Sequence, residues 1–182
     1  MLAHDGGNSF VRSVVVGMHE ALPDSIASNH AMCDDSHKAE SCGSGHHVYN
    51  ALLDFQNKKS VYVLASHSHF YMKGIFDNLP PDRRLPGWIV GTAGAVRYKL
   101  PENSPPDAKT DVYGYIVATV EGDGRIEFDF RQVLKSDIPK TVRQLYPAPL
   151  ISWCFAHNSE NRDAHAKDIT SRCPPVDSAA TH

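Results

Sequence analysis

Three histidines stand just after two short apolar runs. His19 follows residues 13–17 with one methionine between, and His67 and His69 follow residues 61–65 after one serine. Neutral imidazoles are common ligands of zinc, iron and manganese. Because alternate residues of an extended segment point to the same side, we expect His67 and His69 to face one point. The spacing predicts a metal site, with ordinary surface histidines as the alternative.

A β-α-β unit must position these histidines. Residues 13–17 and 61–65 are short, apolar and rich in valine, which is typical of strands buried on both faces. Between them, residues 46–58 carry apolar side chains at helical spacing, so we predict a helix there. Parallel strands end at a shared crevice, where open α/β sheets bind ligands. His19 can therefore reach the same point as the later pair.

The rest of the chain predicts further strands and loops. Residues 88–95 form a third apolar run, and residues 112–120 and 125–133 predict a hairpin around a Glu-Gly-Asp-Gly turn. Residues 23–45 are polar and predict a long loop, and residues 101–110 predict a proline-rich one. We therefore predict an α/β fold with the histidines at the strand ends.

Composition narrows the classes of protein. Apolar residues make up 41% of the 182-residue chain, which excludes a disordered or fibrous protein. The net charge is -3, from 18 Lys+Arg and 21 Asp+Glu, so nucleic acid and anionic membranes are not expected partners. The apolar runs are too short for a membrane helix, and the first ten residues carry no secretory signal. A displaced start would have removed such a signal, so the compartment stays open.

The four cysteines predict no motif. Cys33, Cys42, Cys154 and Cys173 form no Cys-x-x-Cys pair, so we expect isolated thiols and neither a cysteine zinc site nor a redox motif. A disulfide between Cys33 and Cys42 is the alternative if the protein is exported.

The segment Val14-Val-Val-Gly-Met-His19, followed after a helix by Leu64-Ala-Ser-His67-Ser-His69, resembles the C-terminal half of calcineurin-like metallophosphoesterases. In that family, a strand-ending His and a later Gly-His-x-His supply the last three ligands of a two-metal site. The resemblance covers residues 11 to 133 approximately. It implies the C-terminal part of a four-layer αββα β-sandwich flanked by helices. It also implies that His19 and His67 bind one metal and His69 the other, the metals being Mn, Fe or Zn.

The chain departs from the family pattern in two ways. Ser66 stands where the family has Gly. The family's first half carries Asp-x-His, Gly-Asp-x-x-Asp and Gly-Asn-His-Asp/Glu motifs, which include the catalytic His, and none of them stands ahead of His19 here. We therefore expect the chain to begin within the domain. The expected division is a lead-in at 1–10, the C-terminal half of the phosphoesterase domain at 11–135, and a partly disordered extension at 136–182.

The resemblance implies a hydrolase that cleaves phosphomonoesters or phosphodiesters with a dinuclear metal centre. Two close dications need carboxylate charge between them, so we expect three neutral histidines alone to bind at most one metal. Substrate contacts are expected at His30 and Arg97. One alternative is a non-catalytic remnant that binds a metal or a partner, such as the missing half or a second copy. The other is a mononuclear His₃ zinc hydrolase.

Overall fold

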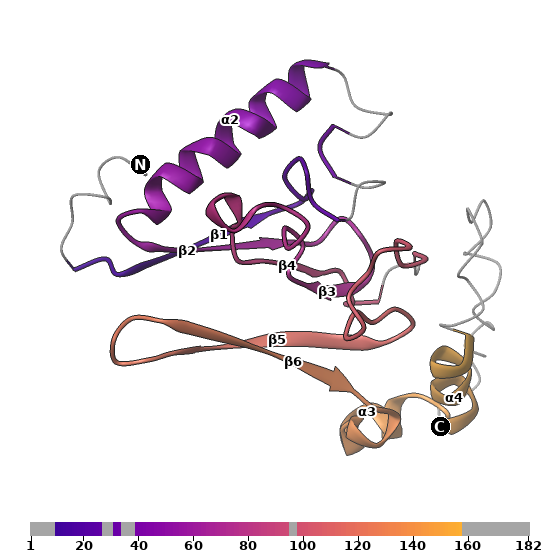
Figure 1. Ribbon diagram of the computed structural model, residues 1–182. Coiled ribbons are helices and arrows are strands. Elements are labelled where there is room, and N and C mark those ends of the chain that lie inside the picture. Colours follow the sequence, from indigo (N-terminus) through magenta and orange to yellow (C-terminus); the bar gives the residue numbers. More distant parts are fainter. Residues whose placement is uncertain (1–9, 27–30, 34–38, 95–97, 158–182) are drawn as a thin grey trace.

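The chain has a mixed α/β fold in the computed structural model, which describes residues 10–26, 31–33, 39–94 and 98–157 (Figure 1). The main sheet contains β1 (Ser13–Met18), β2 (Ser60–Ala65), β4 (Gly87–Val90) and β3 (Tyr71–Lys73), in that spatial order. A separate hairpin consists of β5 (Tyr113–Val120) and β6 (Ile126–Val133). The helices are α2 (Ala39–Gln56), α3 (Lys140–Leu145) and α4 (Ala148–His157), with short 3-10 turns η2 (Pro81–Arg83) and η3 (Lys135–Asp137).

The predicted β-α-β unit is confirmed. β1 and β2 pair in parallel with α2 between them in the chain, and the register ends with Met18 opposite Ala65. β4 is also parallel to β2, whereas β3 is antiparallel to β4. The residues that follow β1 and β2 therefore leave the sheet at the same end of these two parallel strands, which brings His19 next to Ser66.

Three layers result, with the sheet in the middle (Figure 1). One face carries α2, whose buried side chains join those of β2 and β4 in the larger core cluster. The other face carries the hairpin, and there Tyr62, Tyr71 and Trp88 pack against partly buried side chains such as Phe128 and Phe130. The predicted hairpin is confirmed, and its period-2 pattern explains the packing, because Phe128 and Phe130 project from one face of β6.

Several sequence predictions are wrong in detail. β1 is not buried on both faces: it lies at one edge of the sheet, where fewer neighbours cover its side chains, none of its residues is buried, and Val15 is 43% exposed. The helix begins at Ala39 rather than at residue 46, which shortens the predicted loop at 23–45. β4 ends at Val90, well before residue 95. The sequence patterns also failed to predict β3, α3 and α4, which are short or lack a clear apolar stripe.

Tyr49 ties α2 to the loop before β4. Its side chain is 1% exposed, its hydroxyl donates to the carbonyl oxygen of Arg83 at 2.5 Å, and its ring meets Phe76 edge to face. Burial raises the pKa of Tyr49 from 10.0 to about 12. Deprotonation thus requires a charge in the core, which the fold resists.

We expect this tyrosine to make the fold alkali-sensitive. Because the folded state holds the proton more tightly than the unfolded chain, its contribution is complete below pH 10.0 and is lost as the pH rises through about 12. The loss should reach about 3 kcal/mol. Urea unfolding across this range measures it. Tyr49→Phe should cost about 1 kcal/mol at neutral pH and show a smaller alkaline loss; an unchanged alkaline loss would refute the assignment.

Candidate functional site: a histidine pair at the strand ends

His19 and His67 meet where β1 and β2 end. The backbone N–H groups of Ser66 and His67 both donate to the carbonyl oxygen of His19, at 3.0 and 2.7 Å. These two bonds continue the contact between the two segments just beyond the last paired residues of β1 and β2, and they hold the segments side by side. Nδ1 of His67 then lies 2.9 Å from Nε2 of His19, with the ring centroids 4.7 Å apart and the rings inclined by 68°.

This distance restricts what the pair can hold. Two ring nitrogens at 2.9 Å cannot both present lone pairs, because the lone pairs repel. A proton between them makes a hydrogen bond, and a metal ion between them makes a coordination site. Two nitrogen ligands of one tetrahedral zinc ion lie ~3.4 Å apart. The pair therefore needs to open by only about half an ångström to bind a metal.

His69 has a ring contact of its own. Residues 67–70 form successive bends rather than an extended segment, so the i, i+2 argument that His67 and His69 share a side does not apply to them. The ring of His69 stacks on Tyr98, with centroids 4.4 Å apart and planes inclined by 20°. In the described part of the chain, no third His, Cys, Asp or Glu joins the pair in a group whose ligand atoms all lie within 4.8 Å.

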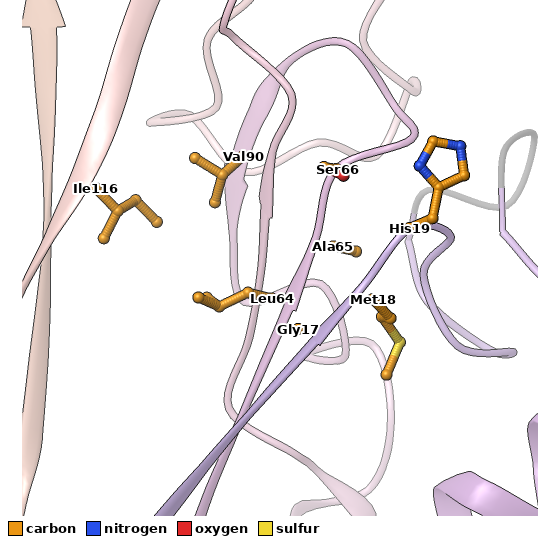
Figure 2. A pocket seen from close by; sticks show the side chains of 8 residues that line it. All are labelled: Gly17, Met18, His19, Leu64, Ala65, Ser66, Val90 and Ile116. Carbon is orange, nitrogen blue, oxygen red and sulfur yellow. The ribbon is translucent and has the colours of Figure 1, made fainter.

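A hollow of about 630 Å³ lies at the carboxyl ends of β1, β2 and β4, with His19 among its lining residues. Figure 2 shows its lining: Leu64 and Val90 point toward Ile116 of the hairpin, and His19 lies on the other side of β1 and β2. His19 is exposed and His67 half-buried, so both rings can be reached from solvent. The hollow lies at the strand ends, as parallel topology predicts, but of the three predicted ligands only His19 is among the residues that line it. The other predicted contact residues, His30 and Arg97, lie outside the described residues.

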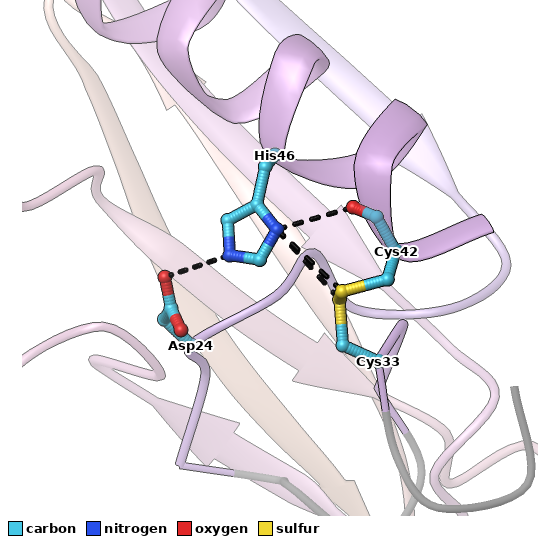
Figure 3. The surroundings of a disulfide bond; sticks show 4 residues. All are labelled: Asp24, Cys33, Cys42 and His46. Carbon is cyan, nitrogen blue, oxygen red and sulfur yellow. Dashed lines mark hydrogen bonds and ion pairs between the residues drawn. A yellow bond between two sulfur atoms is a disulfide. The ribbon is translucent and has the colours of Figure 1, made fainter. Parts of the chain in front are cut away.

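A second cluster was missed by the sequence reasoning. Cys33 and Cys42 form a disulfide, which is the pairing named as the alternative, so the first expectation of isolated thiols is wrong for these two residues (Figure 3). His46 lies beside them and faces Asp24 with its other ring nitrogen. The signal was the i, i+4 spacing of Cys42 and His46, which share a face of α2. The predicted helix began at residue 46 and left Cys42 in a loop, so the i, i+4 relation between the two residues was not recognised.

No protein-family model, curated protein or solved structure matches this chain. None of the helices among the described residues combines the length and the apolar character that a membrane span requires.

Proposed function

We propose that this chain supplies histidine ligands to the metal centre of a calcineurin-like phosphoesterase that hydrolyses phosphomonoesters or phosphodiesters. The observation that carries the proposal is the meeting of His19 and His67 at the ends of parallel strands, with nitrogens 2.9 Å apart. These are the two histidines that the resemblance to that family assigns to one metal. The proposal includes the finer fold, in which the described layers are part of a four-layer αββα domain.

The pair suits one metal ion. Two imidazoles converge, they are reachable from solvent, and Mn, Fe and Zn all accept such ligands. When bound, the metals of such a centre activate a water molecule for attack on phosphorus. His19 and His67 would hold one metal, and the backbone bonds from Ser66 and His67 to His19 would keep the two rings in place.

A second metal is not supported by the described residues alone. Among the described residues, His69 stacks on Tyr98 and forms no three-residue ligand group with the pair, and the resemblance assigns it to the other metal. No described carboxylate completes a group with the pair, and two dications at 3.5–4 Å need negative charge between them. We therefore expect at most one tightly bound metal per disulfide-bonded chain. Within the described ranges no third histidine joins the pair in a ligand group, which argues against the mononuclear His₃ alternative.

A binding role without catalysis is the second candidate. β1 is an edge strand, and Val15 on it is 43% exposed. Exposed strand edges accept further strands, so this edge could pair with another chain. This candidate does not require a metal at the histidine pair, and metal titration separates the two.

The test is calorimetric titration of the metal-free, disulfide-bonded chain with Mn²⁺ or Zn²⁺. We expect one equivalent, and we expect His19→Ala or His67→Ala each to weaken binding at least about 100-fold. His47→Ala is the matched control, because His47 is an exposed histidine on α2. Binding that survives both pair substitutions would refute the proposal, and two tight equivalents would refute the one-metal limit.

Activity gives a separate readout. We expect the chain alone to be a poor phosphoesterase toward a chromogenic phosphomonoester, because the family's catalytic His is not among its motifs. In a preparation that does turn over, His69→Ala should abolish activity. If activity and metal content both survive that change, the role assigned to His69 is wrong.

A further inference from the structure

The disulfide cluster has the composition of a metal site of a different kind. Sγ of Cys42 and Sγ of Cys33 lie 3.6 and 3.8 Å from Nδ1 of His46. One ligand atom from each of the three residues falls within 4.8 Å of the others, and all three residues are partly buried. A site with two thiolates and an imidazole binds zinc in preference to magnesium, calcium or manganese.

We propose that Cys33, Cys42 and His46 form a zinc site in the dithiol state of the protein, and that the disulfide is its metal-free, oxidised state. In a tetrahedral zinc site, sulfur and nitrogen ligands lie ~3.6 Å apart. Both sulfur–nitrogen distances already match this value, at 3.6 and 3.8 Å. Once the S–S bond is broken, only the two sulfur atoms must separate, to ~3.8 Å. A water molecule would complete the four ligands.

The position of His46 supports this assignment. Cys42 and His46 are four residues apart on α2 and so present their side chains on one face. Nε2 of His46 lies 3.3 Å from Oδ2 of Asp24 (Figure 3). With the proton on Nε2, the ring donates to this carboxylate and turns the lone pair of Nδ1 toward the sulfur atoms. Histidine ligands of zinc are oriented by carboxylates in this way.

Asp24 is held for this role by its backbone. It lies on the loop after β1 at φ 65°, a left-handed conformation that is uncommon outside glycine. The side-chain amide of Asn78 donates to the carbonyl oxygen of Asp24 at 3.1 Å. In the oxidised state, Nδ1 of His46 also lies 3.1 Å from the carbonyl oxygen of Cys42. That contact requires the proton on Nδ1, so metal binding must move the proton to Nε2 or remove it.

The exchange balances with a dithiol as reductant. One thiolate of the dithiol attacks a cysteine sulfur, the S–S bond breaks, and a mixed disulfide forms. The second thiol of the reductant then attacks the mixed disulfide. The reductant is released as a cyclic disulfide, and the protein has gained two electrons. Cys33 and Cys42 become thiolates that bind Zn²⁺, and two protons go to solvent. Cys42 lies in the first turn of α2, where the helix dipole favours the thiolate. A small disulfide oxidant reverses the process and releases Zn²⁺.

Cobalt titration tests the site, since thiolate bound to Co²⁺ absorbs strongly in the near ultraviolet. The chain carries Cys154→Ser and Cys173→Ser, so that its thiols come only from the disulfide pair. After reduction with a dithiol and removal of the reductant without oxygen, we expect one equivalent of Co²⁺ to produce the absorption and Zn²⁺ to displace it. The oxidised chain should give none. The histidine pair contains no sulfur, so the outcome is independent of the proposed function.

Conservative variants separate a built site from two adventitious thiols. Asp24→Asn keeps the cysteines and should weaken Co²⁺ binding about 10–100-fold. His46→Gln should weaken it at least as much, and His47→Gln, one residue along α2, should leave it unchanged. Three results would overturn the proposal: no thiolate absorption in the reduced chain, binding unaffected by both Asp24→Asn and His46→Gln, or loss of native circular dichroism on reduction that Zn²⁺ does not restore.

Discussion

Replacing Gly91 by alanine is expected to break the His19–His67 contact and to destabilise the fold by about 3 kcal/mol or more. A Cβ atom at this position would overlap the carbonyl oxygen of Ser68 and would lie 2.8 Å from that of Ser66. Both are backbone atoms and cannot rotate away. The loop that carries His67 would have to move as a whole, away from the end of β4.

Gly17→Ala is the matched control. Gly17 lies in β1, close to the same site, but a Cβ there would meet nothing within 4 Å. This change should leave the stability within about 1 kcal/mol of the original, since alanine restricts the unfolded chain more than glycine does. Urea unfolding followed by circular dichroism compares the two variants, and metal titration tests the histidine pair. Equal losses from both variants would show that the close approach at Gly91 is unimportant.

Trp88→Ala should cost about 3–5 kcal/mol, because it removes the residue on which the hairpin rests. The indole is 6% exposed and packs in a cluster with the rings of Tyr62 and Phe128, whose centroids are 6.2 and 4.6 Å away. Without it, the hairpin would have a cavity against the sheet. We expect the loss in urea unfolding and, in nuclear magnetic resonance spectra, broadened signals from β5 and β6.

Trp88→Phe distinguishes ring packing from hydrogen bonding. Among the described residues, the buried Nε1 of Trp88 has no hydrogen-bond partner. Phenylalanine keeps most of the aromatic contact and removes this unsatisfied donor, which offsets the lost ring atoms. The variant should therefore stay within about 1 kcal/mol of the original protein. A loss as large as that of Trp88→Ala would mean that the indole has a role beyond packing.

The strands that carry the histidines were predictable because their valine-rich runs stand out from polar surroundings. The burial of β1 was not, because an edge strand and a central strand can share one composition; only the position of the strand in the sheet sets its exposure. The start of α2 was also hidden. Residues 39–45 contain two glycines and two serines, which favour loops, and the helix there must be stabilised by its surroundings.

The site was half predictable for a similar reason. Parallel strand ends brought His19 and His67 together as topology requires. The path of the chain after β2 depends on bends at residues 67–70, which no periodicity reveals, and these turned His69 toward Tyr98. The contact of His46 with Asp24 joins a helix to a distant loop, so it depends on tertiary structure alone.

The edge position of β1 also has a consequence for the order of folding. β5 and β6 pair across a short turn, and β3 and β4 are near in sequence, whereas β1 must find β2 across the whole crossover that contains α2. Contacts between distant residues form late because the closing loop loses entropy. The disulfide lies within this crossover and shortens the path. Among the strands of the main sheet, β1 pairs across the longest stretch of chain and should dock last and detach first. A ligand that binds both His19 and His67 would therefore slow this detachment and lengthen the lifetime of the folded chain.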